Sequence, residues 1–360
     1  MCPLTIRLLV NMYMNQKIMV KWSNMLSQPF GVSNGVRQGG VLSPLFFSIY
    51  MDDLLLKLKS SGLGCHIGTH YFGVLGYADD LVLLCPTKEG LRKMVSICET
   101  YAAEYDIIFN GSKSNLLIFG SSAEALPIIR VNGAPVPVSG TALHLGNKIS
   151  IDISDVIDFG IGKFNSSFNY FMATYGKCQS LVKNKLFVQY CTSFHGSQIW
   201  PIYHKDSMRK ICVRWRMALR RIWNLPSNTH CDLLPLLTSQ CPIDIQLKCR
   251  FLKFYKSLRN SKNTLVKYLS NLSTFSCYLT MSKNLNMVLQ EQNLDISELL
   301  NISIGHIKTL YYQKWLSSIN AQYKTHSSLI HELCMIRDGI LVSDMEPDMI
   351  KFMIQFLCTL

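Results

Sequence analysis

Two adjacent carboxylates, Asp79 and Asp80, lie where the sequence predicts the tip of a β-hairpin. They interrupt an apolar stretch from Gly73 to Cys85, whose pattern predicts strand, tight turn and strand. Successive side chains of a strand point to opposite faces, so only a turn could direct both carboxylates to one place. There they would repel each other unless a divalent cation lay between them. The alternative is a solvated turn, in which acidic residues are common.

Two further blocks could surround an anionic ligand. Upstream, residues 35–44 join a pair of glycines to a helix with Ser43 as its expected N-cap. Glycine allows the backbone to approach a ligand closely. Downstream, residues 110–114 form a loop that carries the ammonium group of Lys113. Taken singly, each of these residues could equally be an ordinary turn or surface residue.

The three blocks, in this order, resemble the polymerase motifs of reverse transcriptases, and in particular those of non-LTR retrotransposons. The resemblance runs from about Ile6 to at least Leu225. It is carried by Tyr13, Gln16, Val20, Trp22, the block from Gly35 to Leu54, Tyr77-Ala78-Asp79-Asp80, Lys113-Ser114, Leu145-Gly146, Leu186-Phe187, Tyr190-Cys191, Gly196-Ser197, Trp200 and Leu225-Pro226.

The resemblance implies a metal-dependent transfer of nucleotides from deoxynucleoside triphosphates to a DNA primer on an RNA template. It makes Asp79 the principal ligand of Mg²⁺ or Mn²⁺, with Asp80 beside it as a second ligand. Lys113 would protonate or neutralise the leaving pyrophosphate. The implied location is inside the cell, in the nucleus or in a ribonucleoprotein particle.

The resemblance also implies which residues border the substrates. Those around the incoming nucleotide and the template base are Arg37, Gln38, Gly39, Tyr77 and Ala78. Leu145 and Gly146 occupy the position of the motif that supports the primer end. His144 precedes them, where the family usually has an aromatic residue.

One expected metal ligand has no counterpart in the sequence. Reverse transcriptases need a further aspartate from a strand that precedes the Gly35 block, but the first acidic residue here is Asp52. Asp52 and Asp53 fall in the helix after Pro44 and are poorly placed to replace it. We therefore expect a chain that starts inside the palm, lacks the fingers and an endonuclease domain, and is inactive by itself.

The formal charge of +13 is unevenly distributed. Residues 161–262 hold 17 basic and 3 acidic residues, whereas residues 1–160 are balanced at 12 and 12. Residues 263–360 hold 7 basic and 8 acidic residues. An excess of this size in the middle of the chain indicates a polyanionic partner, with nucleic acid as the leading candidate.

A basic amphipathic helix is predicted from Lys205 to Trp223. Arg209, Arg216 and Arg220 should share one of its faces, opposite an apolar stripe. Such a helix could follow the phosphates of a nucleic acid, lie on a membrane surface or simply be solvated. Its place after the predicted palm favours contact with the nucleic-acid backbone.

The elements predict an α+β fold, a partial reverse-transcriptase palm followed by helices. Helices are expected from Ser43 to about Lys57 and from Leu91 to Tyr105, and short strands at 107–109 and 115–119. Beyond Ile157 helical patterns dominate. We expect three domains, a palm at 1–155, a basic thumb or connection at 156–262 and a helical region at 263–360.

Other classes fit less well. No apolar run is long enough to span a membrane. The two cysteines nearest to each other in the sequence, Cys241 and Cys249, are eight residues apart, so the sequence contains no CxxC metal or redox motif. We expect no disulfide-linked partner. A noncatalytic nucleic-acid-binding protein derived from a reverse transcriptase remains the main alternative. A group II intron maturase or telomerase-like enzyme would share the hairpin, but fits residues 195–200 poorly.

Overall fold

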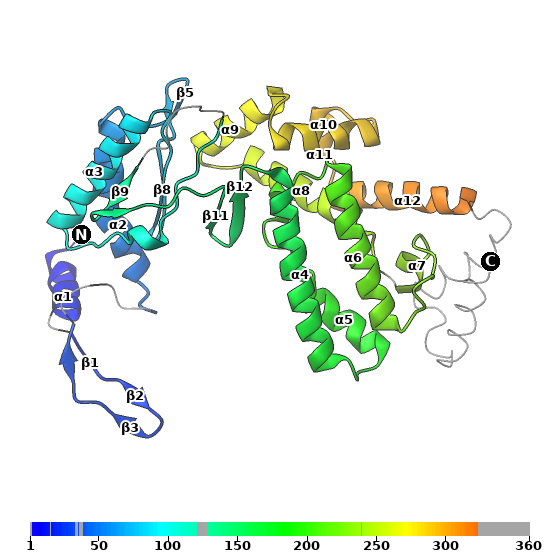
Figure 1. The fold of residues 1–360 in the computed structure, drawn as a ribbon, viewed down its shortest axis with the longest axis horizontal. Helices are drawn as coiled ribbons and strands as arrows, with labels where there is room; N and C mark the ends of the chain where they lie inside the picture. Colours follow the sequence, from blue (N-terminus) through cyan, green and yellow to red (C-terminus); the bar gives the residue numbers. More distant parts are fainter. Residues whose placement is uncertain are drawn as a thin grey trace. The chain divides into compact units, whose positions relative to one another are not determined.

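The structure is a computed structural model that describes residues 2–14, 16–32, 35, 39–120, 128–238 and 240–322. The chain divides into two compact units, Met1–Ser139 and Gly140–Leu360. Each unit is described by itself, and Figure 1 labels the elements of both. The division into domains at 1–155, 156–262 and 263–360 stays a prediction.

The first unit combines helices with short antiparallel hairpins, as the predicted α+β class requires. Within the described residues every sheet has two strands. In chain order the elements are α1 (Pro3–Tyr13), β1 (Lys17–Ile18), β2 (Lys21–Trp22), β3 (Met25–Leu26), β4 (Phe30–Gly31), α2 (Ser43–Ser60), β5 (His66–Ile67), β6 (His70–Tyr71), β7 (Val74–Tyr77), β8 (Asp80–Leu83), α3 (Lys88–Glu104), the 3-10 helix η1 (Gly111–Lys113), β9 (Arg130–Val131) and β10 (Ala134–Pro135).

The core of the first unit lies between α2 and α3. Apolar residues that recur every three or four positions place one face of each helix against the other. Their buried side chains are Met51, Leu54 and Leu58 from α2 and Met94, Cys98 and Tyr101 from α3. Val74, Leu81 and Leu83 of the β7–β8 hairpin pack on the same core, so the hairpin rests on a helical platform.

Helix α3 confirms its sequence prediction, and its start has a clear cause, since the Thr87 side chain accepts a hydrogen bond of 3.1 Å from the Gly90 amide. The predicted cap of α2 is wrong, because Ser43 is already helical and Leu42 holds the cap position without a side-chain hydrogen bond.

The prediction of two short strands at 107–109 and 115–119 is also wrong, because these segments do not pair with each other as strands. Only an isolated bridge joins Leu116 to Val138.

The second unit is helical apart from one hairpin at its start. Its elements are β11 (Thr141–His144), β12 (Asn147–Ser150), α4 (Ile153–Tyr175), α5 (Ser180–Cys191), the 3-10 helix η2 (Ser197–Ile199), α6 (Lys205–Trp223), α7 (Leu234–Thr238), α8 (Ile243–Arg259), α9 (Thr264–Phe275), α10 (Thr280–Gln292), α11 (Ile296–Asn301) and α12 (Ile304–Gln322). The fading of strand patterns beyond Ile157 predicted this change.

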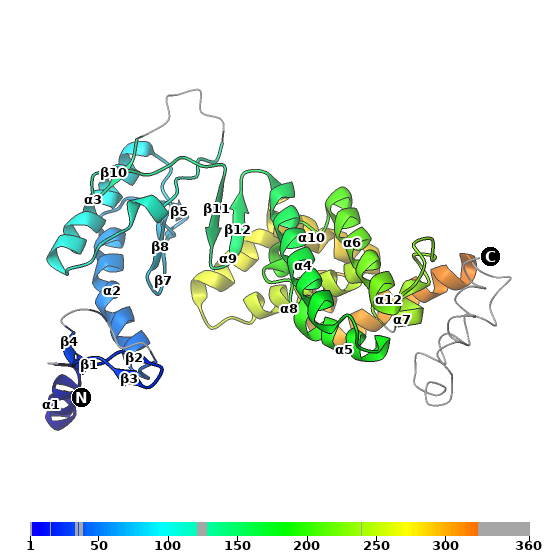
Figure 2. The ribbon, with the colours of Figure 1, turned by 60° about the horizontal axis from the view of Figure 1, so that its bottom comes forward.

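An aromatic core holds the second unit together. One stripe of α4 contributes Phe164, Phe168 and Phe171, which are buried. The Trp215 ring of α6 lies 5.1 Å from the Phe187 ring of α5 and 6.2 Å from that of Phe164, between ring centroids. Helices α4, α5 and α6 therefore pack side by side, as Figures 1 and 2 show. No helix in the part of the chain that the structure describes has the length and apolar character to cross a bilayer.

Candidate metal and nucleic-acid site

The β7–β8 hairpin places Asp79 and Asp80 at its tip. Tyr77 pairs with Asp80, which leaves a two-residue turn made of Ala78 and Asp79. Ala78 has a φ of +51°, a left-handed value that turns of this length require at a central position. Both carboxylates are exposed. The turn and the first residue of β8 therefore present two adjacent acidic side chains to solvent from a hairpin that packs on the core.

The pairing also decides which side chains share a face. Directly opposed residues of an antiparallel pair lie on the same face of the sheet, so Asp80 shares its face with Tyr77 and Val82 with Leu75. Tyr77 is 64% exposed and Leu75 50%. Gly76 and Leu81 lie on the opposite face, toward the core. An acidic pair beside an exposed aromatic ring could hold a cation next to a nucleotide base.

Carboxylate oxygens are the ligands that Mg²⁺ and Mn²⁺ prefer. Proteins usually bind Mg²⁺ through one or two carboxylates, with substrate phosphates and waters completing the shell, and the pair at Asp79 and Asp80 fits that pattern. Among the described residues no group of three or more His, Cys, Asp or Glu side chains could hold a metal ion. These two carboxylates are thus a partial ligand set.

Lys113 lies in a loop whose backbone is firmly held. The Asn110 side chain accepts hydrogen bonds from the Lys113 amide at 3.2 Å and from the Ser112 hydroxyl at 2.7 Å. Gly111 is buried, and a Cβ there would lie 3.0 Å from the Val131 carbonyl oxygen. The Lys113 side chain itself is exposed. In the described structure it forms no ion pair with Asp79, so their cooperation stays a prediction.

The glycine block is only partly described. Gly39 has a φ of +80° with open space around its Cα, which explains the residue type by backbone conformation. Arg37 and Gln38 lie outside the described residues. Leu145 and Gly146 form the two-residue turn of the β11–β12 hairpin, in the second unit.

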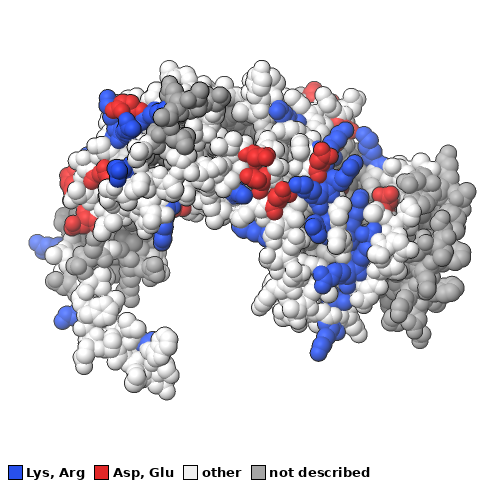
Figure 3. Space-filling view, viewed as in Figure 1, with Lys and Arg blue, Asp and Glu red and all other residues white. Residues whose placement is uncertain are grey.

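The three arginines predicted to share a face of α6 differ in environment. Arg209 is exposed and Arg216 half-buried. Arg220 is bound within the fold, since its Nη2 donates to the Thr229 carbonyl oxygen at 2.7 Å and approaches the Cys231 Sγ at 3.3 Å. Figure 3 shows Lys and Arg side chains gathered along α6. The exposed basic residues of this helix include Arg209, Lys210, Arg214 and Arg221.

Several other basic residues of the positively charged middle also have partners inside the fold. Arg250 donates to the carbonyl oxygens of Thr192 and Ser193, both at 2.5 Å, and burial lowers the pKa of its guanidinium. Lys210 forms an ion pair of 2.9 Å with Asp158. Charge counting had assigned such residues to a polyanion. They still contribute to the positive field, but their donors are engaged.

Sequence reasoning missed two polar residues at the second hairpin, Lys163 and His195. Both donate to the turn at Leu145 and Gly146. They lie 17 and 50 residues from their acceptors, so no local spacing could have indicated either contact.

Comparison with known proteins agrees with the motifs. Residues 2–148 match the family "Reverse transcriptase (RNA-dependent DNA polymerase)". The chain is 46% identical over 67 residues to a Pol polyprotein of the type-1 retrotransposable element R2 of Nasonia vitripennis, covering 19% of this chain and 6% of that protein. It is 31% identical over 114 residues to the R2 polyprotein of Popillia japonica, covering 30% and 16%.

A longer alignment reaches into the helical unit. The chain is 22% identical over 253 residues to an RNA-directed DNA polymerase from the mobile element jockey of Drosophila funebris, covering 64% of this chain and 27% of that protein. The chain thus spans about a quarter or less of the length of these relatives.

Proposed function

We propose that the chain is part of an RNA-directed DNA polymerase of the non-LTR retrotransposon kind, because residues 2–148 match the reverse transcriptase family and the relatives include proteins of the elements R2 and jockey. Its substrates are an RNA template, a DNA primer and deoxynucleoside triphosphates. The observation that carries the proposal is the exposed pair Asp79 and Asp80 at the tip of a hairpin that packs on the α2–α3 core.

In this proposal Asp79 and Asp80 hold Mg²⁺ or Mn²⁺. When bound, the ion supplies charge stabilisation to the phosphates that react. The short β7–β8 hairpin sets the position of both carboxylates, because its inner face is anchored by Val74, Leu81 and Leu83. Lys113 supplies a positive charge for the leaving pyrophosphate from a loop that Asn110 holds in place.

The same proposal assigns the nucleotide surroundings. Tyr77 and Ala78 border the incoming nucleotide beside the acidic pair. Gly39, with Arg37 and Gln38, borders the nucleotide and the template base. Exposed arginines of α6, Arg209 above all, contact the phosphate backbone.

A direct test of the metal site uses Fe²⁺ in place of Mg²⁺, with added hydrogen peroxide and ascorbate. Bound Fe²⁺ reduces the peroxide to hydroxyl radicals, which cleave the nearby polypeptide, and ascorbate regenerates Fe²⁺. We expect cleavage close to residue 79, competed by Mg²⁺ and lost in the Asp79→Asn/Asp80→Asn variant. The matched control is Asp52→Asn/Asp53→Asn. It removes another exposed pair of acidic residues that are neighbours in the sequence, this time from α2. Cleavage that survives in the first variant would refute metal binding at the hairpin.

A second candidate function is binding of nucleic acid without catalysis. The observation that favours it is the set of exposed basic side chains on α6, among them Arg209, Arg214 and Arg221, which could bind nucleic acid without the hairpin. We expect the 360 residues, purified by themselves, to bind a primer annealed to an RNA template but not to extend it, because these residues contain no carboxylate before Asp52. Extension with Mg²⁺ that disappears in Asp79→Ala would contradict this expectation and favour an active polymerase.

A further inference from the structure

The turn of the β11–β12 hairpin has an unusual backbone. Leu145 has a φ of +49° and Gly146 a φ of +76°. Glycine adopts such values readily, whereas leucine does so only at an energetic cost. Asn132 and Gly133 occupy the corresponding left-handed positions of the β9–β10 turn, where asparagine tolerates them well. Strained residues of this kind persist only where their surroundings hold them, and they cluster at functional sites.

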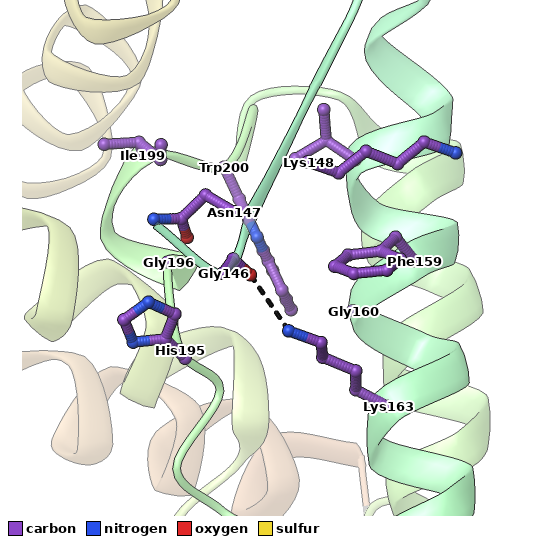
Figure 4. A pocket seen from close by; sticks show the side chains of 11 residues that line it. Gly146, Asn147, Lys148, Phe159, Gly160, Lys163, His195, Gly196, Ile199 and Trp200 are labelled. Carbon is purple, nitrogen blue, oxygen red and sulfur yellow. Dashed lines mark hydrogen bonds between the residues drawn. The ribbon is translucent and has the colours of Figure 1, made fainter. Parts of the chain in front are cut away.

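Two donors from distant parts of the second unit hold this turn. The Lys163 Nζ of α4 donates to the Gly146 carbonyl oxygen at 2.9 Å. The His195 Nε2 lies 3.1 Å from the Leu145 carbonyl oxygen, and because a carbonyl only accepts, this nitrogen carries the proton. Figure 4 shows both side chains directed at the hairpin from different segments of the chain. Each carbonyl of the turn is therefore held separately.

The packing around the turn leaves little freedom. A Cβ on Gly196 would overlap the Asn147 Oδ1, and a Cβ on Gly160 would overlap the Trp200 ring. Trp200 is buried. The hairpin, α4 and the segment around Gly196 thus fit closely together, and the turn cannot shift without moving its neighbours.

The same hairpin exposes apolar side chains. Leu143 is 62% exposed and Leu145 41%, although the turn that carries Leu145 is tightly held. A fixed backbone beneath an exposed apolar side chain suits contact with the sugar or base edge of a nucleotide, which offers apolar surface between its polar groups. The position of the turn, and not an electrostatic attraction, would then determine where Leu145 touches the nucleotide.

The family resemblance implies that the Leu145-Gly146 turn supports the primer end. We propose that Lys163 and His195 are positioning residues, which hold this turn so that Leu145 contacts the terminal nucleotide of the primer. This inference rests on the proposed function, since it requires a primer annealed to a template. Lys163 and His195 themselves act through the turn, and their hydrogen bonds stabilise the left-handed conformation that leucine would otherwise avoid.

The test is photo-crosslinking with the full chain. A DNA primer with 4-thiothymine as its 3′-terminal base is annealed to an RNA template, irradiated with the protein, and the crosslinked peptide is identified by mass spectrometry. We expect crosslinks within residues 143–149. The Lys163→Met/His195→Ala variant removes two hydrogen bonds and should reduce the crosslink yield at least about tenfold, since the loss of one charge-assisted hydrogen bond has an effect of that size. Its affinity for the hybrid should stay close to that of the wild type.

Matched variants separate positioning from folding and from charge. Lys148→Met removes one positive charge from the same hairpin, and the Lys148 ammonium points away from the turn in Figure 4, so the crosslink should remain. Lys163→Arg and His195→Gln each keep a hydrogen-bond donor in the side chain, so these variants should also retain the crosslink. If the double variant unfolds, the single His195→Ala variant carries the test, because His195 is exposed.

The outcomes distinguish this inference from the function on which it rests. Wild-type protein that fails to bind the hybrid would overturn both. Binding with crosslinks only outside 143–149, or crosslinks that persist at full yield in Lys163→Met/His195→Ala, would overturn the positioning role and leave the proposed function standing.

Discussion

The Tyr101 hydroxyl of α3 donates a hydrogen bond of 2.5 Å to the Tyr50 carbonyl oxygen of α2. The Tyr50 hydroxyl in turn donates to the Tyr105 carbonyl oxygen, so two tyrosines join the helices in both directions. The Lys57 ammonium lies 5.0 Å from the centre of the Tyr101 ring. Since the β7–β8 hairpin packs on these helices, the pair supports the platform beneath Asp79 and Asp80.

Removal of one hydroxyl tests this support. We expect Tyr101→Phe to lower the free energy of unfolding by about 1 kcal/mol, the usual net value of a hydrogen bond, because the ring stays and only the bond is removed. Urea unfolding followed by tyrosine fluorescence measures it. Tyr170→Phe is the control, since Tyr170 is 75% exposed. Equal losses of stability in both variants would argue against a specific role for Tyr101.

The same core should make the first unit sensitive to alkali. Burial raises the pKa of the Cys98 thiol from 9.0 to about 12 and that of the Tyr101 hydroxyl from 10.0 to about 12. In both groups the folded state holds the proton more tightly than the unfolded state, so their contribution to stability is complete below pH 9. It should be lost progressively as the pH rises from 9 to 12.

Unfolding free energies measured at intervals between about pH 8 and pH 12 check this dependence. Tyr101→Phe and Cys98→Ala should each flatten the decline above pH 9. If the free energy of unfolding of the wild type stayed constant up to pH 12, burial would not raise the pKa values of Cys98 and Tyr101 as described.

Local patterns predicted the elements that bear the metal site. The apolar stripe of α3 and the break at Asp79 and Asp80 in an apolar stretch were sufficient, because both depend on neighbours close in sequence. The prediction of short strands at 107–109 and 115–119 was wrong, because the formation of a strand depends on a pairing partner that lies far away in the sequence. The sequence did not indicate that, of these residues, Leu116 alone would form a β-bridge, with Val138.

Long-range contacts account for most of what sequence reasoning could not reach at the site. Periodicity placed Arg220 on the basic face of α6, but it could not reveal that the chain returns so that Thr229 offers its carbonyl oxygen. Likewise, nothing in the spacing of Lys163 and His195 relates them to a turn at Leu145. The residue types indicated a charge, and only the fold decides whether that charge faces solvent or a carbonyl.

The distinction within α6 gives a prediction for nucleic-acid binding. Arg209 and Arg214 are exposed, whereas Arg220 is bound to Thr229. We expect Arg209→Ala/Arg214→Ala to weaken binding of an RNA–DNA hybrid and to reduce the slope of log affinity against log salt by about one for each phosphate that the variant no longer neutralises. Fluorescence anisotropy at several salt concentrations measures this slope.

Arg220→Ala should behave differently. Its main effect should be on stability, because a buried carbonyl loses its charged donor, at a cost of about 1–3 kcal/mol. The salt slope of the folded fraction should stay near that of the wild type. A slope reduced by Arg220→Ala as much as by the exposed pair would mean that Arg220 leaves Thr229 to bind phosphate.

Two glycines of the second unit provide a final pair of matched substitutions. Gly196 has a φ of +80°, and a Cβ there would collide with Asn147. We therefore expect Gly196→Ala to destabilise the protein by more than about 1 kcal/mol, from backbone strain and displaced packing. Gly162 lies in α4 with open space around it, so Gly162→Ala should stabilise by about 0.5–1 kcal/mol.

Thermal or urea unfolding of the two variants beside the wild type gives the sign of each effect. The contrast matters for the hairpin, because the Asn147 side chain occupies the space that a Cβ on Gly196 would need, and Asn147 directly follows the Leu145-Gly146 turn. Gly196→Ala should therefore also reduce the primer crosslink at residues 143–149, whereas Gly162→Ala should leave it unchanged. If both alanines had the same effect on stability, the close fit between Gly196 and the hairpin would be contradicted, and with it the rigidity that a positioned Leu145 requires.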